Sequence, residues 1–269
     1  MDSGSYAAVN GALRAEMRLE VLANNLANVN TSGFKQDRIH FDSFMTHPGP
    51  EQFPLPTDSF MGKKFPGDVP FPFSSPAANA YSVTYPRAVR TVVDNTQGGL
   101  ASTGDPNHLA IEGKGFFVVS TPEGPRLTRD GSFRVSANGE LVDKSGNPLM
   151  SDGNAPIQVG NAPFQVGPDG TLSNAEGPIG RVQLVTAPEE SLTKAGNSLY
   201  SAPEAETTPV EEAERSVHQG FLENSNADSL RDMTQMIETN RAFEAYMKMI
   251  QALDSLDGQA ASQIGRLQG

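Results

Sequence analysis

The chain contains no cysteine and no tryptophan. The absence of cysteine excludes disulfide bonds, thiolate metal ligands and cysteine nucleophiles, and it is compatible with an oxidising compartment. The absence of tryptophan, together with only 5 tyrosines among 269 residues, leaves little material for the aromatic platforms of a carbohydrate- or peptide-binding module. Several classes of enzyme and binding protein are therefore disfavoured by composition alone.

Basic charge and long apolar runs are also scarce. The 20 basic residues stand against 32 acidic ones, and the resulting net charge of −12 opposes attraction to nucleic-acid phosphates and anionic membranes. No apolar run reaches the roughly 20 residues that a membrane span needs, and the start "MDSGSYAAVNGALRAE" lacks the layout of a cleavable signal. We expect no nucleic-acid partner and no membrane insertion. The location is expected to be cytoplasmic, or else reached by export without a cleaved signal peptide.

Motifs for catalysis or metal binding are missing. The histidines stand far apart, without the spacing of a zinc site: His40, His47, His108 and His218. The segment "IEGKGFF" lacks the third glycine of a nucleotide-binding loop, and "DKSGN" lacks the downstream glutamate of a calcium loop. We expect no enzyme activity, no cofactor and no metal, although a pair of carboxylates that meet only in space is invisible in a sequence.

The N-terminal residues, from about 4 to 29, have the period of a helix. The apolar positions alternate in steps of four and three, and they are Ala8, Ala12, Ala15, Leu19, Leu22, Leu26 and Val29. This spacing is a heptad seam, which requires a partner helix. The alternative is an amphipathic helix on its own globular core, which would normally show a wider apolar stripe. Gly33 is expected to stop the helix.

Four asparagines interrupt the end of this helix, in "LEVLANNLANVNTSGFK". Asparagine is a mediocre helix former because its side chain competes for backbone hydrogen bonds. An advance of about 100° per residue from Leu22 places Asn25 on a flank of the seam and Asn24 on the far side. We predict that Asn25 hydrogen-bonds across the helix pair and fixes its register, and that Asn24 meets a neighbouring subunit. Asn30 belongs to the stop signal. The alternative is a fraying helix end with solvated asparagines.

The segment from Thr46 to Pro86 is rich in proline and phenylalanine and has no sustained period. Proline excludes a regular helix or a central strand there. The segment is either a disordered linker or a loop that orders against a neighbouring subunit.

From Leu100 to about Ser201, short apolar or alternating runs are separated by turn residues such as Pro168-Asp169-Gly170. This pattern predicts one antiparallel β meander of roughly 100 residues. The strand-like runs are Ala110 to Ile111, Phe116 to Val119, Arg126 to Thr128, Ser132 to Val135 and Arg181 to Thr186.

The C-terminal part begins with an acidic stretch, Ala202 to Ser216, which we interpret as a solvated linker. A second long helix follows, capped by Ser225 or Asn226. Its periodic positions are Met233, Met236, Ile237, Asn240, Phe243, Met247, Ile250, Leu253, Leu256, Ala260, Ile264 and Leu267. Because this helix is too long for a compact domain of this size, we expect it to protrude and to pair with the N-terminal helix.

The predicted fold class is therefore α+β: long N- and C-terminal helices paired as a coiled-coil-like stalk, with a central antiparallel all-β domain. The expected parts are the N-terminal helix and following turn (1–45), a Pro/Phe-rich loop (46–99), the β domain (100–201), the acidic linker (202–216) and the C-terminal helix (217–269). The candidate assembly interface comprises Leu19, Leu22, Asn24, Asn25, Leu26, Val29, Met233, Met236, Ile237, Asn240, Phe243, Met247 and Ile250.

Three ordered motifs carry a family resemblance: "LANNLANVNTSGFK", "LAIEGKGFFVV" with "LTRDGSFRVSANGELV", and "ENSNADSLRDMTQMIETNRAFEAYMKMIQALDSL". With them, the chain resembles the axial proteins of the bacterial flagellum, a family of rod and hook proteins. The opening "MDSGSYAA" and the hairpin "VVSTPEGPRLTRDG" are more similar to proximal-rod members than to distal-rod members.

This resemblance implies a structural subunit of the proximal rod, which assembles helically with copies of itself and other rod proteins and transmits torque across the periplasm. It also implies export through the flagellar type III apparatus without a cleaved signal peptide. Two alternatives stay open: a distal rod subunit, and a β-rich periplasmic or extracellular binding module.

Overall fold

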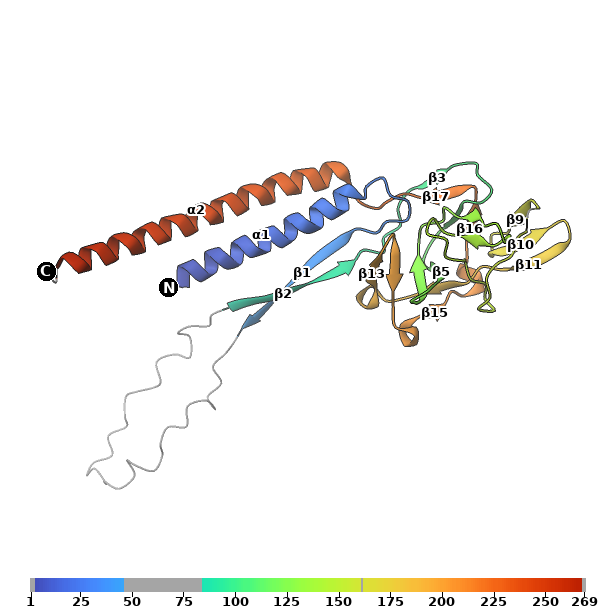
Figure 1. Ribbon diagram of the computed structural model, residues 1–269, viewed down its shortest axis with the longest axis horizontal. Helices are drawn as coiled ribbons and strands as arrows, with labels where there is room; N and C mark the ends of the chain where they lie inside the picture. The colour runs from blue at the N-terminus through green and yellow to red at the C-terminus, as the bar shows by residue number, and fades with distance from the viewer. Residues whose placement is uncertain (1–2, 46–83, 161, 268–269) are drawn as a thin grey trace, which may run out of the picture. The chain divides into compact units, whose positions relative to one another are not determined.

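The computed structural model describes residues 3–45, 84–160 and 162–267, and it contains two long helices and an antiparallel β region (Figure 1). Helix α1 spans Ser3–Ala27 and helix α2 spans Ser229–Leu267. The predicted α+β class and the order helix, β region, helix are confirmed. Neither helix is apolar over a length that would cross a membrane, as judged on these described residues.

The chain divides into two compact units, one made of Met1–Ile39 and Thr91–Gly269 and the other of His40–Arg90. Strands β1 (Asp37–Met45) and β2 (Thr84–Val93) pair as a two-stranded sheet. Strand β1 therefore occupies the end of the part predicted as a helix and following turn (1–45), and β2 occupies part of the segment predicted as a loop (46–99). Pro86 is tolerated in β2 because each strand of a two-stranded sheet has a free edge. The prediction that the remaining Pro/Phe-rich residues order at a subunit interface lies outside the described residues.

The largest sheet has six antiparallel strands in the order β13-β14-β6-β5-β12-β15. Their bounds are β5 Phe116–Thr121, β6 Gly124–Thr128, β12 Leu184–Thr186, β13 Thr193–Gly196, β14 Leu199–Ser201 and β15 Thr208–Pro209.

A three-stranded sheet and three strand pairs complete the β region, again antiparallel. The three-stranded sheet has the order β11-β10-β9, with β9 Phe164–Val166, β10 Thr171–Asn174 and β11 Gly177–Arg181. The pairs are β16 Val217–Gln219 with β4 Leu109–Ile111, β17 Phe221–Glu223 with β3 Leu100–Ser102, and β7 Arg134–Val135 with β8 Leu141–Val142.

Strand β5 explains how the β region builds its core. Successive side chains of a strand point to opposite faces of the sheet. Phe117 and Val119 enter one hydrophobic cluster, whereas Phe116 and Val118 enter a second cluster on the other face. The run "FFVV" is continuous rather than alternating because both faces of this strand are covered. The predicted antiparallel β domain is thus confirmed, with two hydrophobic layers.

Two parts of the C-terminal prediction are wrong. The acidic stretch is not a solvated linker throughout, because β15 and two short 3-10 helices, Glu204–Glu206 and Glu212–Glu214, lie within it. Val210 is buried in the core, and Arg215 donates hydrogen bonds to the carbonyls of Val210 and Val182. The prediction was wrong because the many acidic residues of this stretch are typical of a linker, whereas only a few of its side chains anchor it to the β region.

The second error concerns residues 217–228, which we expected to belong to the C-terminal helix. Strands β16 and β17 occupy the first part, and a helix begins only at Ser229. Its cap is Asp228, whose Oδ1 accepts hydrogen bonds from the backbone N–H groups of Leu230 (3.0 Å) and Arg231 (3.2 Å). Neither Ser225 nor Asn226 caps the helix, since the amide of Asn226 is engaged elsewhere.

Candidate functional site

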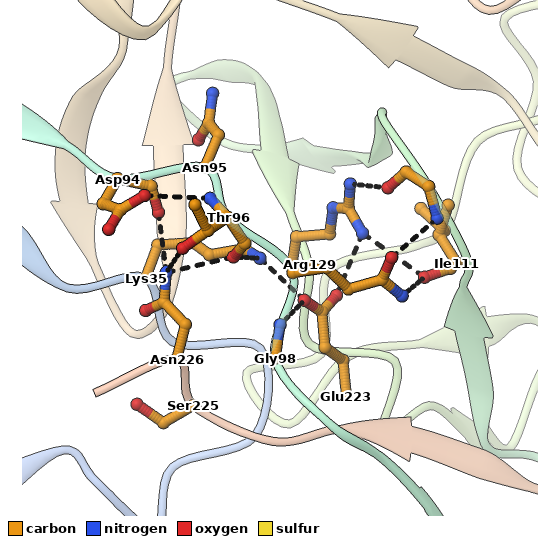
Figure 2. A network of polar contacts seen from close by, with 12 residues as sticks. Lys35, Asp94, Asn95, Thr96, Gly98, Ile111, Arg129, Glu223, Ser225 and Asn226 are labelled. Atoms are coloured by element: carbon orange, nitrogen blue, oxygen red, sulfur yellow. Dashed lines mark hydrogen bonds and ion pairs between the residues drawn. The ribbon is translucent and has the colours of Figure 1, made fainter. Parts of the chain in front are cut away.

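A buried polar cluster joins the ends of both helices to the β region (Figure 2). Glu223 is the last residue of β17, Lys35 lies between α1 and β1, and Arg129 directly follows β6. Figure 2 shows the three charged side chains converging with the segment that contains Thr96 and Gly98. Three stretches of chain that are distant in sequence therefore meet at one carboxylate. We call Lys35, Arg129 and Glu223 the junction.

The carboxylate of Glu223 is fully engaged. Its Oε1 lies 2.6 Å from Nζ of Lys35 and accepts a 3.0 Å hydrogen bond from the N–H of Gly98, while its Oε2 lies 3.0 Å from Nη1 of Arg129. Lys35 also donates to the carbonyl of Thr96 at 2.7 Å. Only 1% of the Lys35 and Glu223 side chains and 3% of Arg129 are exposed, so these charges depend on one another rather than on water.

Burial and charge pairing oppose each other at the two cations. Burial lowers the pKa of Lys35, and the adjacent carboxylate of Glu223 raises it again without fully restoring its usual value. The pKa of Arg129 is lowered for the same reason, with Glu223 as the opposing influence. Its guanidinium also donates to the carbonyls of Ile111 (3.3 Å) and Gly113 (2.6 Å). Such a cluster is stable only while every partner is present.

Asn226 and Asp94 extend the junction toward the start of α2. The amide of Asn226 accepts a 2.7 Å hydrogen bond from the N–H of Gln36 and donates to the carbonyls of Asp94 and Thr96. Burial alone would raise the pKa of Asp94, but hydrogen bonds from Thr96 and Gln36 and the charge of Arg38 outweigh it, so the net shift is downward. These contacts join the segment that follows α1 to the segment that precedes α2.

Asn25 does not hydrogen-bond across the helix pair as predicted. Its amide Nδ2 donates to the carbonyl of Asp37 at 3.0 Å, and its Oδ1 accepts from the N–H of Asp37 at 2.9 Å. The side-chain amide therefore pairs with both backbone groups of Asp37, the first residue of β1, as the backbone of a neighbouring strand would. It is only 2% exposed, so both hydrogen bonds are shielded from water. The prediction failed because the amide found a backbone partner that lies after the helix rather than on the second helix.

The side chain of Asn28 closes the last turn of α1. Asn28 donates a hydrogen bond to the carbonyl of Asn24 at 2.9 Å and accepts one from Thr31. The helix ends at Ala27, well before Gly33, so Gly33 is not its stop residue. Instead Gly33 has a positive φ of 66°, and a Cβ there would lie 2.2 Å from the backbone nitrogen of Asp130. Glycine at this position therefore allows the segment after α1 to lie directly against the backbone of the β region.

The two helices lie side by side and run in opposite directions (Figure 1). The positions predicted for the seam are buried or half-buried: Ala8, Ala12, Ala15, Leu19, Leu22 and Leu26 in α1, and Val29 in the turn after it. The matching positions of α2 are Asp232, Met236, Thr239, Phe243, Tyr246, Ile250 and Leu253. A Cβ on Gly11 would lie 2.4 Å from the ring of Tyr246, so the helices approach closely there.

The candidate interface residues divide into two groups. Leu22 and Asn25 are buried, and the half-buried ones are Leu19, Leu26, Val29, Met236, Phe243 and Ile250. The exposed ones are Asn24, Met233, Ile237, Asn240 and Met247. The half-buried group packs within the chain. Met233, Ile237 and Met247 are 49%, 57% and 40% exposed, so a large part of each of these apolar side chains faces water.

Sequence reasoning missed the junction, Asp232 and Tyr246. No local pattern could have indicated the junction, since its members are single charged residues in unrelated segments. Asp232 and Tyr246 follow the seam spacing and could have been found by extending it. Among the residues that the structure describes, no group of three or more His, Cys, Asp or Glu side chains could hold a metal ion.

Three segments of the chain match family profiles. Residues 6–35 match the flagella basal body rod protein family, residues 110–175 the D1 domain of the flagellar hook proteins FlgE/F/G, and residues 218–264 the C-terminal region of the flagellar basal body rod FlgEFG proteins. The first and third segments include most of α1 and α2, and the second lies in the β region.

Full-length relatives agree with these matches. The chain is 31% identical over 270 residues to the flagellar basal-body rod protein FlgF of Caulobacter vibrioides, covering 99% of this chain and 100% of the relative. It is 28% identical to FlgF of Mesorhizobium japonicum, covering 98% and 99%. It is 32% identical to the rod protein FlgG of Buchnera aphidicola subsp. Acyrthosiphon pisum, covering 90% and 92%.

Proposed function

This chain belongs to the family of flagellar basal-body rod proteins, and we propose that it forms the proximal part of the rod. It is a structural subunit of the bacterial flagellar basal-body rod. The observation that supports the proximal type is the match to FlgF proteins over almost the whole length of both chains. A distal-rod subunit is the second candidate, because relatives named FlgG reach similar identity over about nine-tenths of the chain.

The two terminal helices form a coiled-coil-like pair that joins copies of this chain and other rod proteins into a helical assembly. The seam of alternating three- and four-residue steps on both helices supports this pairing. Exposed apolar side chains, among them Met233 and Ile237, support contacts with other subunits because water-exposed stripes of this kind mark interaction surfaces. Asn24 and Asn240 lie at the polar edges of these contacts.

The assembled rod carries torque across the periplasm, and the subunit reaches it through the flagellar type III export apparatus without a cleaved signal peptide. The role is structural rather than enzymatic. The absence of cysteine is compatible with the periplasm. The junction suits a load-bearing subunit because a buried cluster whose charges pair with one another has little freedom to rearrange.

Electron microscopy of basal bodies from cells that lack this gene tests the proposal. A proximal-rod subunit predicts basal bodies whose rod stops near its base, with motility lost and both restored by the wild-type gene. A rod that grows past its proximal part and lacks only the distal shaft would assign the chain to the distal type. Complete, rotating flagella would contradict a role in the rod.

A further inference from the structure

The helix pair carries exposed apolar side chains on two opposite sides. The first set lies one residue beyond the seam: Val9 follows Ala8, and Met233 follows Asp232. One residue turns a helix by about 100°, so these side chains point out of the plane of the pair rather than across it. We call this set face A, and it comprises Tyr6, Val9, Leu13, Leu230, Met233 and Ile237, with exposures from 42% at Val9 to 76% at Leu230.

Both helices contribute to face A on the same side of the pair. An antiparallel helix pair has a two-fold axis perpendicular to the plane that contains the two helices. This axis exchanges the helices without exchanging the two sides of the plane. Positions that follow the seam by one residue on α1 and on α2 therefore emerge on one common side.

A second set of apolar residues precedes the seam by one residue. Ala245 precedes Tyr246, and Met249 precedes Ile250, so these side chains are turned by about 100° in the opposite sense. We call this set face B, and it comprises Ala242, Ala245, Met249, Ala252 and Leu256, all exposed. Met249 and Leu256 are 50% and 58% exposed, although both are large apolar residues.

The geometry points to a contact in which face A of one copy of this chain packs on face B of a second copy. The inference rests on the rod function proposed above. Two different apolar surfaces on opposite sides of one element form a heterologous contact, which leaves a free face A at one end and a free face B at the other. Such a contact extends into an open assembly, whereas a contact of face A with itself would stop at a dimer.

The two faces are also complementary in size. Face A presents long or aromatic side chains such as Tyr6, Leu230 and Ile237, whereas face B alternates alanine with Met249 and Leu256. Large side chains of one helix pack into the spaces above small residues of another. Methionine in both faces adapts to the remaining irregularities.

Cysteine cross-linking tests this inference directly, because the natural chain has no cysteine. Cells produce only the variant Ile237→Cys with Met249→Cys, and their isolated basal bodies are treated with a short bismaleimide. Twelve residues of helix separate the two positions by about 18 Å, and they lie on opposite sides of the pair, so a short reagent cannot join them within one chain. The matched control combines Ile237→Cys with Glu123→Cys, a side chain 81% exposed in the β region.

The expected result is a ladder of dimers and larger multimers with the double variant, and monomers with either single variant and with the control. Dimers from Ile237→Cys alone would show that face A meets itself and would overturn the inference. So would monomers only, or products whose mass is not a multiple of this chain, from a double variant that is present in basal bodies.

A second pair, Leu13→Cys with Leu256→Cys, is tested in parallel in case the first impairs assembly. Absence of both pairs from basal bodies that contain the wild-type chain would overturn the inference as well, because each pair replaces only one side chain of each face and leaves the other members of both faces unchanged. Absence of the wild-type chain itself would instead contradict the proposed function.

Discussion

The ammonium nitrogen of Lys35 lies 2.6 Å from a carboxylate oxygen of Glu223, although 188 positions of the sequence separate the two residues. This ion pair connects the segment that leaves α1 with the strand that leads to α2. The backbone repeats the connection, because the N–H of Gly33 donates to the carbonyl of Glu223 at 2.8 Å. Both helices are therefore anchored to the β region at one buried point.

Replacing Glu223 with glutamine should destabilise the chain strongly. Glu223→Gln keeps the shape but leaves the buried cations of Lys35 and Arg129 without a counter-charge, and removing one member of a buried ion pair costs about 3–5 kcal/mol. Chemical denaturation of the purified chain measures the change. The control is Glu123→Gln, which breaks an exposed pair with Arg126 and should change the unfolding free energy by less than about 1 kcal/mol.

A double variant separates pairing from general damage at the junction. If Lys35 and Glu223 stabilise each other, Lys35→Met combined with Glu223→Gln should lose less than the sum of the two single variants. Strict additivity of the unfolding free energies would contradict the pairing.

Asn25→Ala should reduce stability by about 1–3 kcal/mol, because it leaves both backbone groups of Asp37 without their buried partner. Asn24→Ala is the matched control, since the Asn24 side chain is exposed. Hydrogen exchange at the N–H of Asp37 should accelerate in the first variant and stay unchanged in the second. Equal exchange in both would mean that the Asn25 amide does not hold β1.

Gly33→Ala should be more harmful than another glycine replacement with similar backbone strain. Gly33 and Gly146 both have positive φ, 66° and 90°, but a Cβ on Gly146 meets nothing within 4 Å. Gly146→Ala should therefore show only the cost of the left-handed conformation, about 1–2 kcal/mol. Gly33→Ala adds a clash with the backbone of Asp130 and should lower the midpoint of thermal unfolding further. Equal shifts would contradict the close approach at Gly33.

Asp232 gives a prediction with a defined pH dependence. This seam residue is buried, its Oδ2 has no hydrogen-bond partner, and burial, assisted by the charge of Asp228, raises its pKa in the folded chain. The folded state therefore holds the proton of Asp232 more tightly than the unfolded state does. As pH rises from the unfolded pKa of this group through its raised folded pKa, the carboxyl ionises and the free energy of unfolding of the chain falls.

Asp232→Asn should consequently match the wild type in acid and be more stable at neutral pH, by on the order of 1 kcal/mol. Thermal unfolding across the acidic range measures the difference. The exposed neighbour Asp228 is unsuitable as a control because it caps α2, so Glu238→Gln, at an exposed position of the same helix, serves instead. A difference between Asp232→Asn and the wild type that does not change with pH would contradict this account.

The sequence predicted the elements that depend on local periodicity. The seam from Ala8 to Val29 was visible because its spacing repeats, and β5 was visible because both of its faces are apolar. Strands β16 and β17 were missed because three residues each are too short for a period to emerge beside the charged residues around them.

The junction could not be predicted for a different reason. A buried ion pair needs two charged residues that meet in space, and neither Lys35 nor Glu223 differs in its local sequence from a solvated residue. The same holds for Asn25, whose partner is a backbone group. Periodicity placed it correctly beside the seam, but it could not identify what the amide would bond to.

The central claim is that the terminal helices make this chain a structural subunit of the rod. The most direct test is electron microscopy of basal bodies, with motility scored in parallel, from cells whose gene lacks the codons for Met233 to Leu267. This deletion removes all of face B, the face A residues Met233 and Ile237, and every α2 seam position except Asp232. We therefore predict a rod that stops near its base and cells that do not swim. Intact basal bodies that support swimming would contradict the account.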